Sequence, residues 1–143
     1  ALAGVDADEQ SPEVASMDEA RLARLAEAIQ SHGVSHVLVK GGHRDERISV
    51  DRLFGGGVLR RFSAPRLAVR NTHGTGCTLS SAIAAGVASG MSLPAAVGHA
   101  KRYVTAALRG ADEHAYGQGP GPLAHFPGWQ RTGVRGVIEE RMV

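Results

Sequence analysis

The order of hydrophobic and polar positions predicts a helix followed at once by a strand near the start of the chain. Ser16 and Glu19 are spaced as a capping box, in which each side chain satisfies a backbone donor of the other at a helix N-terminus. Behind them, apolar residues recur at helical spacing, at Leu22, Leu25, Ala26 and Ile29. Gly33 can end this helix, and the apolar run of residues 34–40 predicts a buried strand. This sequence of elements favours an α/β unit with a parallel sheet.

The middle of the chain predicts a hairpin and then a short strand. Residues 47–54 and 58–62 are strand-like, and the three glycines between them favour a tight reversal of the chain. Residues 66–70 predict a further short strand that leads into a second glycine-rich turn.

Two helices are predicted after that turn. Residues 76–89 form an alanine-rich apolar run that should end at Gly90. Ser92 can cap the next helix, and Pro94 is tolerated in its first turn, so this helix should extend to about residue 109. Small apolar residues should pack the two helices together, namely Ala82, Ile83, Ala96, Val97 and Ala100.

The C-terminal part of the chain shows little periodicity. Glycine and proline dominate residues 110–128, so we expect irregular structure there. Residues 131–143 should form either a short terminal helix or a tail. No internal repeat and no linker interrupts the 143 residues, a length that suits one domain with its own core.

Composition and charge narrow the class of protein. Hydrophobic residues make up 43% of the chain, which argues against disorder. The net charge is only +2 and the basic residues are scattered, so a small anionic substrate is a better partner than nucleic acid. A single cysteine cannot form an intramolecular disulfide, which fits a reducing compartment. No apolar run approaches the ~20 residues of a membrane span, and no signal peptide is visible. These features predict a cytoplasmic protein.

The segment with the clearest chemistry is residues 71–78, Asn-Thr-His-Gly-Thr-Gly-Cys-Thr, directly before a predicted helix. Backbone N–H groups and the helix dipole make such an N-terminus an anion-binding site. The chain's only cysteine, Cys77, stands where the thiolate is favoured. The segment matches neither a Walker A loop nor a Rossmann loop, because the Rossmann pattern would need glycine in place of Leu79. Spacing alone leaves an anion site and a purely structural glycine turn equally open.

Together with residues 37–43, Val-Leu-Val-Lys-Gly-Gly-His, this segment resembles the hydroxymethylpyrimidine/phosphomethylpyrimidine kinases of thiamine biosynthesis. These enzymes belong to the ribokinase-like superfamily. The resemblance runs to about residue 129 and covers only the C-terminal half of such an enzyme. It implies part of a three-layer α/β/α fold with a mostly parallel central sheet. Residues 1–130 would then be the nucleotide-binding half of the kinase domain, and residues 131–143 a tail of unknown role.

The resemblance also implies roles for single residues. An anion hole for the transferring phosphate of ATP would be formed by Gly74, Thr75, Gly76 and Cys77. Cys77 would also take or position the proton of the substrate hydroxyl, and Lys40 would lie at the transferring phosphates. The alternatives are a small buried hydrophobic cysteine and an exposed lysine at a strand end.

Four further residues match the family pattern with weaker implications. His43, His73 and Lys101 would lie near the nucleotide, although a solvated helix lysine is an open alternative for the last of these. Asp51 matches an aspartate of the family's hairpin, and a surface carboxylate is an equally open interpretation. The family's metal-binding N-x-x-E motif lies in the other half, so no metal ligand is expected in this chain.

The implied activity is an ATP-dependent, Mg²⁺-requiring kinase that phosphorylates hydroxymethylpyrimidine and then its monophosphate. A pyridoxal kinase of the same superfamily and a catalytically silent nucleotide-binding half are the alternatives. By resemblance the protein should form a homodimer. A C-terminal half alone would expose a sheet edge and apolar helix faces, so we expect it to need the other half.

Overall fold

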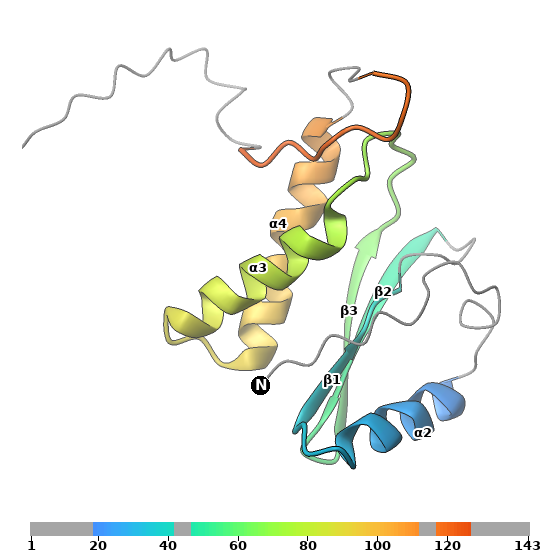
Figure 1. Cartoon of the computed structure of the whole chain (residues 1–143), viewed down its shortest axis with the longest axis vertical. Helices are drawn as coiled ribbons and strands as arrows, with labels where there is room; N and C mark the ends of the chain where they lie inside the picture. Colours follow the sequence, from blue (N-terminus) through green and yellow to red (C-terminus); the bar gives the residue numbers. More distant parts are fainter. Residues whose placement is uncertain (1–18, 42–46, 112–116, 127–143) are drawn as a thin grey trace, which may run out of the picture.

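The computed structural model describes residues 19–41, 47–111 and 117–126 (Figure 1). The three helices predicted before residue 110 are present and begin and end close to their expected bounds. Residues 131–143, for which the sequence predicts a short helix or a tail, lie outside the described residues. The elements are, in chain order, α2 (Glu19–Gln30), β1 (His36–Val39), β2 (Ile48–Gly55), β3 (Val58–Pro65), α3 (Thr75–Ala88) and α4 (Leu93–Ala111). Of the predicted irregular region, residues 117–126 are described, and they contain only one isolated β-bridge.

The three strands form one antiparallel sheet in the order β1-β2-β3. The predicted hairpin is confirmed: β2 and β3 are joined at Gly56 and Gly57, whose φ angles of 59° and 72° are readily available only to glycine. β1 also pairs antiparallel with β2, because the connection of residues 40–47 is too short for the crossover that a parallel pair needs. The other edge of β1 carries no strand from the described residues, and a mostly parallel central sheet stays a prediction.

The sheet lies between two helical layers (Figure 1). Successive strand residues point to opposite faces, so Leu53 packs against α3 and α4 while Phe54 packs against Leu22 and Ala26 of α2. The residues predicted to join α3 and α4 do so, since Ile83, Ala96, Val97 and Ala100 are buried and Ala82 packs against them. The described residues therefore form an α/β/α arrangement around a small sheet.

Two details differ from the sequence-based expectation. Residues 66–70 form no strand: the Arg66 amide donates to the Arg47 carbonyl, and the chain then leaves the sheet, where no described strand is available to pair with it. Leu25 is 47% exposed, although it belongs to the predicted apolar face of α2. The short sheet covers only the narrower stripe formed by Leu22 and Ala26.

Glu19, at the start of α2, ties this helix to the hairpin. Its carboxylate accepts hydrogen bonds from Arg61 and from Arg52 Nε, the latter at 3.1 Å. These two guanidinium groups, Arg61 first, lower the pKa of Glu19 to about 2. Ser16, its predicted partner in a capping box, lies outside the described residues.

Helix α3 has apolar residues both on the side that packs against its neighbours and on surface that no described element covers. One side carries Leu79 and Ile83 into the core beneath α4. Outside this contact, further apolar residues of the helix are exposed, namely Ala84, Ala85, Val87 and Ala88. Such a composition is typical of a helix buried on both sides. None of the described helices is both long and apolar enough to cross a bilayer.

Candidate functional site

The N-terminus of α3 has the geometry of an anion site. Its N-cap residue, Gly74, has a left-handed φ of 84°, which turns the chain sharply into the helix. The Thr75 amide donates to the Thr72 carbonyl at 3.3 Å. Within the described parts of the chain, the amides of Gly76 and Cys77 have no acceptor, as expected for the first turn of a helix. An anion at this point would accept these two donors and meet the positive end of the helix dipole.

Lys40 brings a positive charge to the same point. A Cβ atom placed on Gly76 would lie only 2.9 Å from Lys40 Nζ, so the ammonium group stands directly beside this glycine. Lys40 immediately follows β1, whereas Gly76 is in the first turn of α3. The fold thus joins the two sequence motifs and places the Lys40 ammonium beside the first turn of α3, to which the amides of Gly76 and Cys77 belong. Glycine at position 76 leaves room for the lysine to approach this closely.

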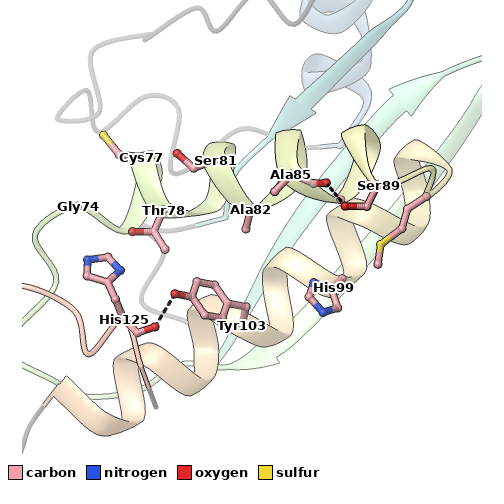
Figure 2. Close-up of a pocket in the computed structure, with 12 residues that line it drawn as sticks. Gly74, Cys77, Thr78, Ser81, Ala82, Ala85, Ser89, His99, Tyr103 and His125 are labelled. Atoms are coloured by element: carbon pink, nitrogen blue, oxygen red, sulfur yellow. Dashed lines mark hydrogen bonds between the residues drawn. The ribbon is translucent and has the colours of Figure 1, made fainter. Parts of the chain in front are cut away.

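Cys77 is exposed at this end of α3, so the described residues do not bury it as a small hydrophobic side chain. Its side chain and that of Ser81 point away from α4, whereas Thr78 and Ala82 face it (Figure 2). A groove continues from this point along α3 and is lined on its far side by residues that include Tyr103 and His125 (Figure 2). The Tyr103 hydroxyl donates to the backbone carbonyl of His125 at 2.7 Å.

The backbone around the glycine turn is fixed by a buried residue that sequence reasoning missed. Asn71 is 3% exposed, and its side chain bridges two distant segments. Its amide donates to the Ala111 carbonyl at the end of α4, and its Oδ1 accepts from the Gly121 amide at 3.1 Å. Asn71 stands at the start of the recognised motif, but nothing in the spacing pointed to these partners. Asn71 thereby holds the glycine turn that leads into the N-terminus of α3.

The histidines predicted near the nucleotide are placed only in part. The His73 amide donates to the Gly121 carbonyl at 3.1 Å, and the residue forms a bridge with Pro122. Its side chain is exposed one residue before Gly74. His43 lies outside the described residues. A nucleotide contact stays a prediction for both.

Asp51 and Lys101 form a buried ion pair next to the site. Asp51 is 4% exposed, which rules out the surface-carboxylate interpretation. Its Oδ2 lies 2.9 Å from Lys101 Nζ, and its Oδ1 accepts from the Gly41 amide at 2.9 Å. The ammonium of Lys101 is therefore engaged with β2, and it is not a solvated helix lysine as in the alternative interpretation. A contact between Lys101 and the nucleotide stays a prediction.

The described residues provide no evident metal site. No three of their His, Cys, Asp and Glu side chains gather closely enough to hold a metal ion. The described acids are only Glu19, Glu27 and Asp51. The one beside the anion site, Asp51, already uses both oxygens on Lys101 and Gly41. These residues therefore do not fit Mg²⁺, which binds through carboxylates and phosphates.

Comparison with known proteins identifies the family. A model of the phosphomethylpyrimidine kinase family matches residues 9–124, which includes both glycine motifs and nearly all of the described structure. The chain belongs to the phosphomethylpyrimidine kinase family. This confirms the resemblance inferred from residues 37–43 and 71–78.

Individual proteins with names from this family or from thiamine biosynthesis also match the sequence of this chain. The hydroxymethylpyrimidine/phosphomethylpyrimidine kinase of Rhizobium meliloti is 53% identical over 112 residues, covering 78% of this chain and 42% of that protein. The thiamine biosynthesis bifunctional protein ThiED of Geobacter sulfurreducens is 46% identical over 109 residues, 76% of this chain and 22% of that protein.

A solved structure supports the α/β class of this family member. The pyridoxal kinase of Staphylococcus aureus, in complex with AMP-PCP and pyridoxal, superimposes with a TM-score of 0.71 at 28% identity. The match covers 80% of this chain and 42% of that one. The chain thus spans less than half the length of each of these three relatives.

Proposed function

We propose that this chain is the phosphate-binding and proton-transferring half of an ATP-dependent hydroxymethylpyrimidine/phosphomethylpyrimidine kinase. The observation that carries the proposal is the position of Lys40 Nζ beside Gly76, at the N-terminus of α3. An ammonium beside a helix N-terminus, whose first amides have no acceptor among the described residues, suits a transferring phosphoryl group, whose charge is spread over several oxygens. Family membership supplies the reaction class.

The proposed reaction uses these groups in distinct roles. With the pyrimidine alcohol as substrate, its hydroxyl oxygen attacks the terminal phosphorus of ATP, the bond to the bridging oxygen breaks, and ADP leaves with that bond's electron pair. With the monophosphate as substrate, an oxygen of its phosphate group is the attacking atom. The amides of Gly76 and Cys77 and the ammonium of Lys40 stabilise the negative charge on the phosphoryl oxygens. The Cys77 thiolate accepts the proton of the attacking hydroxyl. Its exposed side chain points away from α4, toward space where a substrate can approach.

The pyrimidine alcohol and its monophosphate are the proposed substrates, in preference to pyridoxal. The relatives named hydroxymethylpyrimidine/phosphomethylpyrimidine kinases reach 53% identity, whereas the pyridoxal kinase structure is 28% identical. The structural similarity of the latter shows that a related fold holds an ATP analogue and pyridoxal together. It does not favour pyridoxal as the substrate here.

Residues 1–130 are proposed to be the C-terminal half of a kinase domain that needs a second half. The exposed apolar side of α3 would pack against that half, and the open edge of β1 would pair with one of its strands. The described residues also leave Mg²⁺ without a carboxylate at the site. Its ligands are therefore proposed to lie elsewhere in the complete enzyme.

The test joins this chain to the portion of the Rhizobium meliloti relative that it does not match, a protein called here the complemented kinase. We expect the complemented kinase to transfer phosphate from ATP to hydroxymethylpyrimidine with a higher kcat/KM than to pyridoxal. This chain alone and the Rhizobium portion alone should both be inactive. Higher kcat/KM on pyridoxal would favour a pyridoxal kinase. Tight ATP binding without transfer to either alcohol would indicate a silent nucleotide-binding half.

The residue after Lys40 provides a prediction about stability. A Cβ atom at Gly41 would lie 2.1 Å from the backbone oxygen of Val50, so Gly41→Ala forces two backbone segments apart. We expect the free energy of unfolding of the complemented kinase to fall by about 1–3 kcal/mol, as for other overpacked sites. Gly119→Ala is the matched control, since an added Cβ meets nothing within 4 Å there. Equal urea midpoints for the two variants would show that Gly41 is not held against β2.

A further inference from the structure

The peptide that follows Lys40 is held by a closed ring of polar contacts. The Gly41 amide donates to Asp51 Oδ1 at 2.9 Å, and Asp51 Oδ2 pairs with Lys101 Nζ at 2.9 Å. Lys101 Nζ also donates to Ser49 Oγ at 3.0 Å, and the Ser49 hydroxyl lies 3.3 Å from the Gly41 carbonyl oxygen. The ring returns to the glycine where it began, and a guanidinium nitrogen of Arg66 donates to the same carbonyl at 3.2 Å.

The ring joins the residue pair after β1 to β2 and to α4, which is far away in the sequence. Ser49 and Asp51 lie on the same face of β2, two residues apart, and Lys101 reaches them from α4. The side chains of Asp51 and Lys101 are only 6% and 12% exposed. A carboxylate and an ammonium withdrawn from water this far are costly to separate, since removing one leaves the other buried without its partner.

The position of this ring bears directly on Lys40. The Gly41 N–H belongs to the peptide unit that joins Lys40 to Gly41, so Asp51 fixes the backbone torsion immediately after the Lys40 Cα. Gly41 itself has no room to shift toward β2, because the Val50 backbone already occupies the space of a Cβ atom. A side chain as long as lysine reaches a defined point only if its base is fixed. Here its ammonium lies beside Gly76.

We propose that Asp51 and Lys101 are positioning residues for Lys40. They hold the Lys40–Gly41 peptide so that the Lys40 ammonium reaches the anion site at the N-terminus of α3. This inference rests on the proposed phosphate role of Lys40. Displacement of a catalytic group by ~1 Å can cost about 10²-fold in rate, so loss of the buried pair should reduce turnover without removing any group that contacts substrate.

The test measures kcat and KM of the complemented kinase for Asp51→Asn, alone and combined with Lys40→Met. We expect Asp51→Asn to lower kcat by about 10- to 100-fold with little change in the KM for the pyrimidine. In the Lys40→Met background it should lower kcat no further, because the group being positioned is already gone. Adding Lys101→Met to Asp51→Asn should restore part of kcat, since the unpaired ammonium is removed while the introduced asparagine can still accept from the Gly41 amide.

Glu19→Gln is the matched control. It breaks the ion pair between Glu19 and Arg52, which follows Asp51 on β2, and it does not affect any contact of Gly41. It should leave kcat unchanged. An equal loss of kcat from Asp51→Asn in both backgrounds would overturn the positioning role, as would a lowered melting temperature with unchanged kcat.

Two results of this experiment lead to further conclusions: an Asp51→Asn variant that does not fold, and a Lys40→Met variant that keeps its kcat. If Asp51→Asn does not fold, Ser49→Ala decides, because it removes one link of the ring and keeps the ion pair. Ser49→Ala should lower kcat modestly, and again only when Lys40 is present; no loss of kcat, or an equal loss in both backgrounds, would overturn the inference. If Lys40→Met alone leaves kcat intact, the phosphate role of Lys40 fails, and the positioning role fails with it.

Discussion

Replacing Cys77 by alanine in the complemented kinase should lower kcat by about 10²–10⁴-fold, the usual contribution of a positioned base. The KM for ATP should change little, because the backbone amides that face the phosphate are retained in the variant. The thiol is exposed at the first turn of α3 and borders the same groove as Gly74. Steady-state kinetics on hydroxymethylpyrimidine, with ATP affinity from calorimetry, separates the two effects.

Cys77→Ser is the matched variant for this prediction. Serine keeps a hydrogen-bonding group of similar size but is a far weaker acid than the thiol, so it can orient the substrate hydroxyl without accepting its proton effectively. We expect its kcat to fall between those of the unaltered enzyme and Cys77→Ala. If kcat is unchanged in Cys77→Ala, the thiol has no part in the mechanism. If kcat falls equally in both variants, hydrogen bonding by the thiol is excluded as its role, and its role as a proton acceptor remains.

Lys40→Met should lower the kcat/KM for ATP by about 10²–10³-fold, the cost of losing one donor that stabilises developing charge. The substitution keeps most of the side chain's length and apolar stem and removes only the ammonium beside Gly76. The loss should appear mainly in kcat if the ammonium follows the transferring phosphoryl group, and mainly in KM if it binds ATP equally before and during transfer.

Arg60→Met is the control for the overall charge. Arg60 is exposed on β3, which β2 separates from β1, so this variant loses one positive charge on a strand that does not pair with the one before Lys40. Its kinetics should match those of the unaltered enzyme. Normal kinetics in both variants would exclude Lys40 from the phosphate site, and equal losses in both would indicate general attraction of ATP by net charge.

The elements that the sequence predicted well are those encoded by neighbouring residues. The apolar spacing and end signals of α3 and α4 are local, and so are the glycines of the β2–β3 hairpin, which the structure confirms at Gly56 and Gly57. The predicted strand at residues 66–70 was wrong, and Leu25 is exposed although it lies on the predicted apolar face of its helix. Strand pairing and burial each depend on a partner element and not on the segment itself. The sequence alone does not specify whether that partner exists.

Within the candidate site too, the features that could be predicted are those encoded by neighbouring residues. The placement of Gly74 and Cys77 at the start of a helix could be predicted, because its signals lie within one short motif. The approach of Lys40 to Gly76 followed only from the resemblance to a family, since the two residues come from separate motifs. The partners of the buried side chains of Asp51 and Asn71 could not be predicted, because each binds groups far away in the sequence and single-sequence patterns carry no such pairing.

The most direct test of the account is a crystal structure of the complemented kinase with AMP-PCP. It should place oxygens of the terminal phosphate about 3 Å from the amides of Gly76 and Cys77 and from Lys40 Nζ, the ordinary range of hydrogen bonds. A triphosphate bound elsewhere, with the N-terminus of α3 facing only solvent, would contradict the assignment of this turn as the site of phosphoryl transfer.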